Sequence, residues 1–347
     1  GYMMIGAALL RYGDASNFEI SDSLLCPTPS SNQVLVNIHS SSVNPIDIMK
    51  REGYGKAVFE KQRRSNFPWV LGSDFSGTIS EVGSKVTKFK EGDEVWGCTA
   101  DANHGTYAEY GVFDLEEIEH KPVNLSFNEA ASLPYVALTT WAGVIRWAGL
   151  RPQDIANKKV LIQAGSGGVG TFAIQLFKLW GAEVATTCSK KNHELVKKLG
   201  ADVVIDYTNE DFVEVLNDYD IVLDSVGDLA GETEIERCSK ILKQNKNSHY
   251  ITLNHAFART IDEKGFLLGV PHALFLRQKL KNKYKPVNVH WSIFRPSLSA
   301  LQELTKLVSE GDVIPVIDRT YKLTDIKQAQ DYVATGHAVG KVVMEIQ

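Results

Sequence analysis

The stretch Lys159–Trp180, KVLIQAGSGGVGTFAIQLFKLW, decides the fold that the sequence predicts. Its apolar run Val160-Leu161-Ile162 is typical of a short buried strand. From Val169 onward, apolar side chains recur at residues 169, 172, 173, 176, 177 and 180, which is the spacing of one helix face. Between these two segments lies the glycine-rich run Gly165–Gly170. A strand, a tight turn and a helix therefore follow one another.

The turn contains the pattern G-x-G-x-x-G, with glycines at 165, 167 and 170. Between a strand and a helix, such glycines permit a tight turn, a close approach of the backbone to a diphosphate, and close packing of the helix on the strand. The start of the helix adds free N–H groups and partial positive charge. The turn indicates a dinucleotide-binding site, and an ordinary glycine-rich loop is the alternative.

The residues after the next strand indicate which dinucleotide is preferred. An NAD site usually has a carboxylate there for the ribose 2′-hydroxyl, but this chain has Thr187-Cys188-Ser189-Lys190-Lys191. A hydroxyl and two ammonium groups suit a 2′-phosphate. We therefore predict NADPH as the cofactor, against the alternative that these lysines are simply a solvated helix start.

Outward from this stretch, the chain divides by its strand and helix pattern. Up to about Phe127 it shows alternating strands and glycine turns, as in Gln33–His39 and Gly77–Val82. From Asn128, strands and helices alternate, which is typical of βαβ units around a parallel sheet. After Pro296 come one capped helix and a closing strand, too little for a domain. The predicted domains are residues 1–127 with 296–347, which are rich in β-strands, and 128–295, a doubly wound α/β domain.

Composition excludes several classes of function. The 347 residues carry 37 Lys+Arg against 42 Asp+Glu, a net charge of −5, and the basic residues are scattered. We therefore expect no nucleic-acid partner. The apolar runs are too short to span a bilayer. The four cysteines have no spacing suited to a structural zinc site or a disulfide framework, which predicts a reducing compartment.

Several motifs together carry a family resemblance. They are Val43-Asn44-Pro45-Ile46-Asp47, Leu71–Gly77, Gly92–Trp96, Ser132-Leu133-Pro134 and Gly167-Gly168-Val169-Gly170. Nearly the whole chain resembles the zinc-free quinone oxidoreductase branch of the medium-chain dehydrogenase/reductase superfamily, and within it one mitochondrial member most of all. The resemblance implies a GroES-like catalytic domain, an inserted Rossmann domain, and an active cleft between the two.

The resemblance also implies where the cofactor lies. It places Ser166, Gly167, Gly168 and Val169 at the diphosphate, and Ser189, Lys190 and Tyr207 around the 2′-phosphate and adenine. It places Ser225 and Leu253 near the ribose and the nicotinamide. It also has His337, Ala338 and Val339 closing over the cofactor, and Trp291 and Ile293 lining the cleft. For Tyr207, Leu253 and Trp291, plain core packing is the alternative. We expect no metal site, because Gly72-Ser73-Asp74 stands where zinc-dependent relatives have ligands.

Asn44 and Tyr54 are the catalytic candidates. Hydride transfer leaves negative charge on oxygen, which an amide or a phenol can meet as a hydrogen-bond donor. The predicted activity is NADPH-dependent reduction of a quinone, with ubiquinone metabolism as its setting. The alternatives are reduction of an enone or 2-enoyl thioester, or service as an NADPH-binding scaffold.

The remaining expectations concern location and partners. The resemblance implies a mitochondrial location, with cytoplasm as the alternative if it does not hold, and a transit peptide absent from this chain. It also implies a peripheral membrane or membrane-protein partner. The oligomeric state stays open between a monomer and a homodimer.

Overall fold

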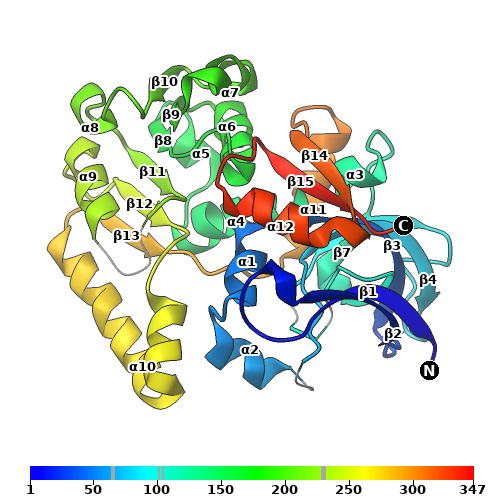
Figure 1. Ribbon diagram of the computed structural model, residues 1–347. Coiled ribbons are helices and arrows are strands. Elements are labelled where there is room, and N and C mark those ends of the chain that lie inside the picture. The colour runs from blue at the N-terminus through cyan, green and yellow to red at the C-terminus, as the bar shows by residue number, and fades with distance from the viewer. Residues whose placement is uncertain (64–66, 101, 104, 228–231) are drawn as a thin grey trace. The chain divides into compact units, whose positions relative to one another are not determined.

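The structure, a computed structural model, describes residues 1–63, 67–100, 102–103, 105–227 and 232–347. These residues form two compact units, Gly1–Leu138 with Pro296–Gln347, and Thr139–Arg295 (Figure 1). The first unit thus continues past residue 127, where the sequence analysis had placed its end. Two hydrogen bonds tie the residues after 127 to this unit: Ser40 Oγ donates to Asn128 Oδ1 at 2.6 Å, and the Tyr135 N–H donates to Asp74 at 2.7 Å.

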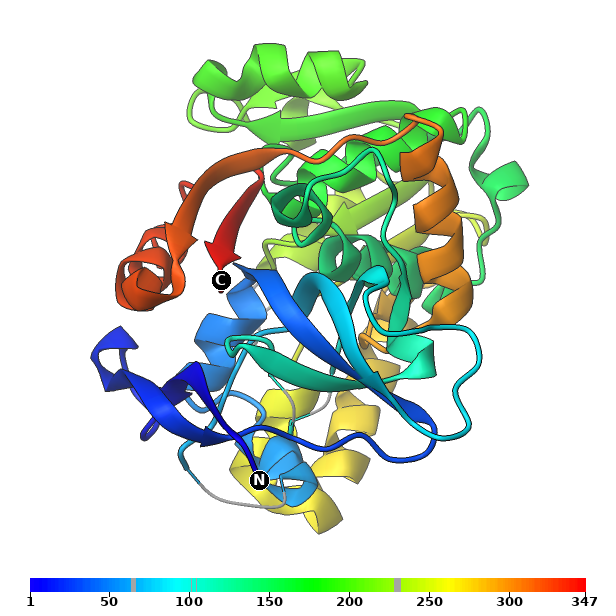
Figure 2. The ribbon, with the colours of Figure 1, turned by 90° about the vertical axis from the view of Figure 1, so that its right-hand side faces the viewer.

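The first unit is rich in β-structure. Its strands are β1 (Met3–Leu9), β2 (Phe18–Leu25), β3 (Gln33–Val43), β4 (Asp74–Val82), β5 (Glu94–Cys98), β6 (Tyr110–Asp114), β7 (Ile118–His120), β14 (Ile317–Lys322) and β15 (Lys341–Glu345). The main sheet has the order β14-β15-β3-β4-β5-β7, with β6 also paired to β3 and β1-β2 forming a separate pair. Antiparallel pairing joins β15 to β3, seen in Figure 2 as the red C-terminal strand beside the blue strand. The C-terminal segment thereby completes this sheet.

The helices of this unit are mostly short. They are α1 (Pro45–Arg51), α2 (Lys56–Gln62), α3 (Phe127–Ala130), α11 (Leu298–Ser309) and α12 (Ile326–Ala334), with 3-10 turns at Ala15–Asn17, Leu115–Glu117 and Leu323–Asp325. α11 starts where Ser297 accepts a hydrogen bond from the Ala300 N–H, and it buries Leu301, Leu304 and Val308. In the core, Phe75 and Phe113 stack with ring centroids 3.8 Å apart.

The second unit holds a six-stranded parallel sheet. Its strands are β8 (Lys159–Ile162), β9 (Glu183–Cys188), β10 (Val203–Asp206), β11 (Ile221–Asp224), β12 (His249–Thr252) and β13 (Asn288–Trp291). They lie in the order β10-β9-β8-β11-β12-β13, and every neighbouring pair is parallel. The order reverses beside β8, so loops that follow β8, β9, β11 and β12 gather at one edge, where ligands bind in such sheets. The predicted doubly wound sheet is confirmed.

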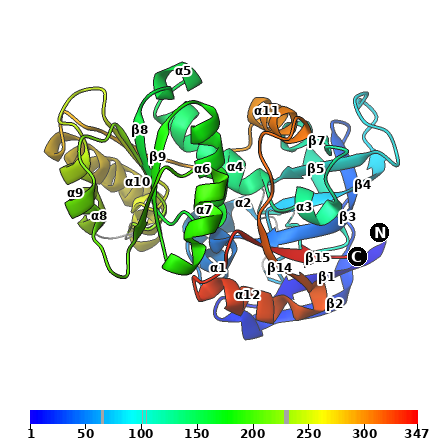
Figure 3. The same cartoon turned by 90° about the horizontal axis from the view of Figure 1, so that it is seen from above.

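Helices cover both faces of this sheet. They are α5 (Pro152–Ile155), α6 (Gly168–Leu179), α7 (His193–Leu199), α8 (Phe212–Val215), α9 (Thr233–Ile241) and α10 (Phe257–Lys283), with a 3-10 turn at Lys190–Asn192. Seen from above, α6 and α7 lie on one side of the sheet and α8, α9 and α10 on the other (Figure 3). The segment joining the units consists of α4 (Pro134–Trp141) and a π-helix at Ala142–Trp147. Among the described residues, no helix is both long enough and apolar enough to cross a membrane.

Two histidines on β12 and β13 make the stability of the second unit depend on pH. His249 Nδ1 and His290 Nε2 are 3.0 Å apart, so one ring donates to the other. Burial, then His249 and Lys281, lower the pKa of His290 to about 4. An unfolded histidine binds its proton near pH 6.5. Between about pH 6.5 and 4 protons therefore favour the unfolded chain, and we expect a loss on the order of 2 kcal/mol.

Urea unfolding across that pH range measures this loss, with His290→Gln as the comparison because glutamine does not titrate. The wild-type free energy of unfolding should fall more steeply with acid than that of the variant. Equal slopes for the two proteins would show that the histidine pair does not carry the effect.

Candidate functional site

Close packing requires a glycine at position 170, the third glycine of the turn. α6 begins at Gly168, with Gly167 in the position just before it. A Cβ on Gly170 would lie 2.2 Å from the Ala164 carbonyl oxygen and 2.7 Å from the Gly165 Cα. Real atoms do not approach so closely, so any side chain here would push the first turn of α6 away from the loop. This is the role that the pattern predicts for its last glycine.

The first glycine has a different role from the one expected. The left-handed residue of the turn is Ala164, with φ of 52°, and Gly165 does not have a positive φ. A Cβ on Gly165 would instead lie 2.1 Å from Thr186 Oγ1 on the neighbouring strand β9. The loop is also tied to β9 by hydrogen bonds from Ala164 N to Thr187 Oγ1 (3.1 Å) and from Gly165 N to the Thr187 carbonyl (2.9 Å).

This loop fits a dinucleotide diphosphate. Ser166, Gly167, Gly168 and Val169 are all partly exposed at the start of a twelve-residue helix. No side chain of the described residues caps that helix start, so its first N–H groups are available to an anion. The absence of a Cβ at Gly167 and Gly168 leaves the backbone open to close approach.

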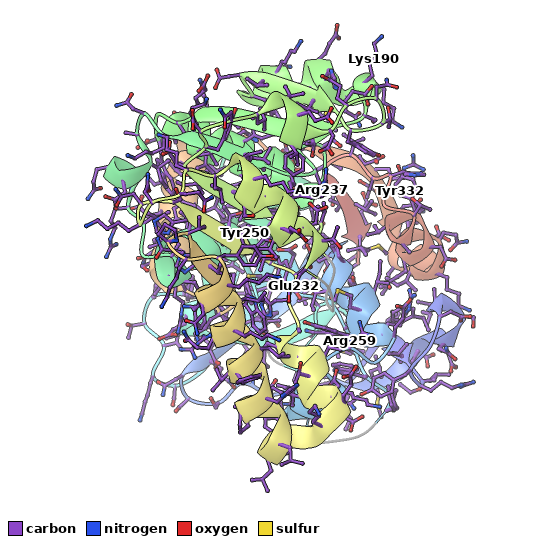
Figure 4. The ribbon with its side chains drawn as sticks, turned by 90° about the vertical axis from the view of Figure 1, so that its left-hand side faces the viewer. Lys190, Glu232, Arg237, Tyr250, Arg259 and Tyr332 are labelled. Carbon is purple, nitrogen blue, oxygen red and sulfur yellow. The ribbon has the colours of Figure 1, made fainter. Side chains whose placement is uncertain are left out.

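The end of β9 carries the groups predicted for the 2′-phosphate. Lys190 is exposed and points outward in Figure 4, and Ser189 is partly exposed. Asp206 lies across from Cys188 in the parallel register, so a carboxylate does reach this edge. Its oxygens accept hydrogen bonds from Thr208 and Asn209, and Thr208 above all lowers the pKa of Asp206. Tyr207 is 63% exposed, which rules out core packing for it.

Ser225 and Leu253 follow β11 and β12 at the same edge. Asn254 Nδ2 donates to the Ser225 carbonyl at 2.7 Å, and the Leu253 N–H donates to the Asp224 carbonyl at 2.9 Å. The buried Asp224 carboxylate accepts from the Val226 and Gly227 N–H groups, both at 2.8 Å, and from the Tyr250 hydroxyl. Burial raises the pKa of both Asp224 and Tyr250. Asp224 therefore holds the backbone of this edge in place.

Trp291 is the last residue of β13, and Ile293 follows it at the same edge of the sheet. The two side chains differ in exposure. Trp291 is 5% exposed, belongs to the core cluster of the unit, and stacks on His255 with centroids 5.0 Å apart. Ile293 is 38% exposed, and its carbonyl accepts from Trp147 Nε1 at 3.0 Å. Trp291 is packed in the core and also lines a cavity with Thr252, Asn254 and His255, and Ile293 is more exposed, so the cofactor role of both stays a prediction.

The first unit gathers buried polar side chains around Asn44, the residue just before α1. Asp74 Oδ2 accepts from Ser42 Oγ at 2.5 Å and from Asn44 Nδ2 at 3.1 Å. Lys341 Nζ lies 3.3 Å from the same oxygen and donates to Asn44 Oδ1. Asp74 and Asn44 have no exposed surface, and Lys341 is 5% exposed. The lysine and the aspartate thus fix the Asn44 amide from both ends.

Asp47 secures the same helix start. Its Oδ2 accepts from the Asn44 N–H at 2.9 Å and from the Tyr107 hydroxyl at 3.2 Å. Burial raises the pKa of Asp47, against the lowering effect of Lys50 and of the Asn44 N–H. The Ser42 carbonyl lies 2.9 Å from the same hydroxyl, so the one Tyr107 hydrogen is shared between the two acceptors. Asp47 therefore positions Asn44 through its backbone, as Asp74 and Lys341 position it through its side chain.

Tyr54 lies at the other end of α1. It is partly exposed, and its N–H donates to the Met49 carbonyl at 2.9 Å. α1, which is about 10 Å long, and the two residues Glu52 and Gly53 separate it from Asn44. The remaining candidates, His337, Ala338 and Val339, follow α12, and the Val339 N–H donates to Asp318 at 2.8 Å. His337 is exposed, while Ala338 and Val339 are partly exposed.

Asp74 and Lys341, which hold Asn44, and Asp224, which anchors the cofactor edge, are residues whose roles no sequence motif indicates. Each stands at the end of a strand. A charged residue at the end of a buried strand is a usable signal, because burial of a charge requires partners. The sequence does not say which partners, since Asn44 and Lys341 are 297 positions apart.

Comparison with known proteins agrees with this architecture. The family description "Alcohol dehydrogenase GroES-like domain" matches residues 30–123, and "Zinc-binding dehydrogenase" matches residues 199–344. The Danio rerio protein "NAD(P)H oxidoreductase RTN4IP1, mitochondrial" is 40% identical over 91% of this chain and 84% of its own length. The "NADPH-dependent alkenal/one oxidoreductase, chloroplastic" of Arabidopsis thaliana is 30% identical over 96% and 77%. The quinone oxidoreductase from Coxiella burnetii has a TM-score of 0.81 at 31% identity, covering 99% and 100% of the two chains.

The chain belongs to the medium-chain dehydrogenase/reductase family of NAD(P)H oxidoreductases. The mitochondrial member that its motifs resemble most is the reticulon-4-interacting, or Nogo-interacting, oxidoreductase, and the match to the RTN4IP1 proteins confirms that prediction. The GroES-like and Rossmann classes predicted for the two parts are confirmed as well. In the part of the chain that the structure describes, no three His, Cys, Asp or Glu side chains are grouped as metal ligands. Independence from zinc stays a prediction.

Proposed function

We propose that this enzyme uses NADPH, without a metal ion, to reduce a quinone. The observation that carries the proposal is the edge of the parallel sheet, where an open helix start at Gly167-Gly168 stands beside Ser189 and Lys190. The carboxylate at the end of the neighbouring strand β10, Asp206, accepts hydrogen bonds from Thr208 and Asn209 of its own turn. A 2′-phosphate therefore meets a hydroxyl and an ammonium group instead of a free acid.

NADPH should bind more tightly than NADH. The double variant Ser189→Ala/Lys190→Ala should reduce the difference between the two affinities. Each lost contact to a charged phosphate should weaken NADPH binding by about tenfold or more, while NADH binding should change little. Titration of the two cofactors by fluorescence or calorimetry measures this. The exposed Lys197 of α7 provides the matched control, Lys197→Ala. Equal affinity of the unmodified protein for the two cofactors would rule out the NADPH assignment.

NADPH supplies a hydride when bound. The protein must stabilise the negative charge that reduction leaves on the acceptor oxygen. Asn44 is suited to donate a hydrogen bond, because Lys341 holds its oxygen and Asp74 takes one of its amide hydrogens. We assign the second hydrogen of that amide to the acceptor oxygen of the substrate. Tyr54 is the candidate proton donor, because its phenolic hydroxyl can donate a hydrogen bond or a proton to an oxygen.

Reduction of an enone or 2-enoyl thioester is the second candidate. The printed name of the Arabidopsis thaliana relative, an alkenal/one oxidoreductase, favours it. The two acceptors place different demands on the site. A reduced quinone is a relatively stable anion that solvent can protonate, whereas an enolate needs stronger stabilisation and a placed acid.

Tyr54→Phe separates these two candidates. If the enzyme reduces quinones, kcat should change by less than about tenfold, because solvent completes the protonation. If it reduces enoyl substrates, kcat and kcat/KM should fall together by roughly 10²–10⁴-fold. Steady-state kinetics with both acceptors measure the change, and Tyr2→Phe, at a side chain that is 87% exposed, is the control. A large loss with substantial enoyl turnover in the unmodified enzyme would favour the second candidate.

We further propose a mitochondrial location and a role in ubiquinone metabolism. The mitochondrial designation of the Danio rerio relative supports the location. The name "Reticulon-4-interacting protein 1, mitochondrial", carried by the Caenorhabditis elegans relative, supports a membrane-protein partner.

A further inference from the structure

Helix α10 carries a cluster of large apolar side chains on its surface. Leu267 is 89% exposed, Leu268 69%, Phe275 61% and Leu274 42%. Residues seven and eight apart lie on the same face of a helix, so Leu267, Leu274 and Phe275 form one continuous apolar strip, which Leu268 widens. We call these four residues the apolar tip.

The opposite face of α10 is anchored in the second unit. Gly269 and Ala273 are buried, and Leu276 and Leu280 pack against the core cluster that contains Trp291. A Cβ on Gly269 would lie 2.7 Å from the Ile261 Cα, so the two arms of α10 pack closely on each other. Because this face of α10 is packed on the second unit, the side chains of the apolar tip lie on the face exposed to solvent.

The apolar tip lies beside a bend. Gly265 has φ of 78° and ψ of 173°, which interrupts the helix and folds α10 into two arms. The bend points away from the parallel sheet of its own unit, as the yellow helix shows in Figures 1 and 4. Leu267 and Leu268 are the second and third residues after it. A convex end is therefore formed, rather than a groove.

The second arm and the loop after it are strongly cationic, although the chain as a whole has a net charge of −5. From residue 265 to residue 295 there is no Asp or Glu. The basic residues of this segment are Arg277, Lys279, Lys281, Lys283, Lys285 and Arg295. Lys283 pairs with Glu232 at 2.8 Å. Lys279 and Lys285 are exposed, and Lys279 also lines a cavity with Glu232 and Glu234. On the first arm, Glu263 pairs with Arg259 at 3.3 Å, and the exposed Lys264 directly precedes the bend.

We propose that the apolar tip and the lysines behind it dock the protein on an anionic lipid bilayer. Leucine and phenylalanine side chains on a convex end can enter the boundary between headgroups and acyl chains, and nearby lysines attract anionic headgroups. A second copy of this chain fits less well, because two such cationic segments would repel each other. The docking needs no substrate, so it is independent of which acceptor the enzyme reduces.

Co-sedimentation of the full chain with vesicles tests the proposal. Vesicles of phosphatidylcholine with cardiolipin should bind it at least about tenfold more strongly than phosphatidylcholine alone. The double variant Leu267→Gln/Leu268→Gln should lose at least about tenfold of that binding, since the inserted groups are gone. Lys279→Glu/Lys285→Glu should lose roughly fivefold or more for each charge.

Two matched controls distinguish vesicle binding through this surface from nonspecific binding by any exposed apolar side chain and from an effect of net charge. Val123→Gln changes an apolar side chain that is 98% exposed in the first unit. Lys197→Glu/Lys198→Glu makes the same charge change on α7, where both lysines are exposed. Both controls should bind vesicles as the unmodified protein does. Thermal unfolding of each variant shows that it is folded, and Leu267→Trp adds a direct probe, whose emission should shift to the blue with cardiolipin vesicles.

Equal binding to both vesicle types would overturn the proposal, and so would controls that lose as much binding as the α10 variants. If Leu267→Gln/Leu268→Gln turned a dimer into a monomer and left vesicle binding unchanged, the tip would be a contact between copies instead. An unshifted Leu267→Trp emission would likewise contradict insertion.

Discussion

Lys341→Met is expected to lower the free energy of unfolding by about 3–5 kcal/mol. Lys341 is the cation 3.3 Å from Asp74 Oδ2, and the carboxylate has no exposed surface. Methionine keeps most of the side-chain volume but leaves Asp74 as a buried charge without its cation. Removal of one partner of a buried pair costs far more than removal of an exposed one. Urea unfolding followed by circular dichroism measures the change.

The matched control is Lys322→Met, which removes an exposed lysine from β14 and should cost less than about 1 kcal/mol. A double variant, Lys341→Met with Asp74→Asn, should recover part of the loss, because it removes the unpaired charge as well. Catalysis should fall in Lys341→Met even where the protein is folded, since Asn44 loses the group that holds its oxygen. Equal stability of Lys341→Met and Lys322→Met would refute the view that Lys341 stabilises the fold by neutralising the buried Asp74.

Gly170→Ala is expected to disrupt the cofactor turn with a single methyl group. Its Cβ would lie 2.2 Å from the Ala164 carbonyl oxygen, and a backbone oxygen cannot move aside alone. α6 must then shift away from the loop, at a cost of about 1–3 kcal/mol in stability. The helix start would also move from the diphosphate, so NADPH affinity should fall by roughly 10²-fold or more. Thermal unfolding without cofactor and NADPH titration measure the two effects.

Gly167→Ala is the informative comparison, because the nearest atom to its added Cβ is the Ala164 oxygen at 3.4 Å, an ordinary contact. The protein without cofactor should keep its stability, while NADPH binding should weaken where the methyl group meets the diphosphate. Loss of stability in both variants, or tight NADPH binding in both, would contradict the separate roles assigned to the two glycines.

The cofactor half of the fold could be predicted because its signals are local. The predicted strand and helix around the glycine turn match β8 and α6 to within a residue, and Ser297 begins a helix as its position suggests. Strand and helix periods and a capping hydroxyl are read within a few residues of each other. The resemblance then supplied the family, which the relatives confirm.

The parts that escaped prediction depend on distant partners or on shape. Lys341 and Asp74 meet across 267 positions, and each looks in isolation like an ordinary charged residue beside a strand. Gly165 is required by Thr186 on the next strand rather than by its own backbone angle. The basic run Lys279–Lys285 is simply a solvated face by its charge, and its significance depends on the bend at Gly265 that places the apolar tip beside it.

NADPH-dependent reduction of a quinone can be measured as steady-state oxidation of NADPH. The acceptors are a short-chain ubiquinone and a crotonyl thioester, each assayed with and without a chelator. We expect saturable turnover of the quinone, a larger kcat/KM than for the thioester, a lower rate with NADH, and no effect of the chelator. Tight NADPH binding without reduction of the quinone, or a faster reaction with the thioester, would contradict the proposed function.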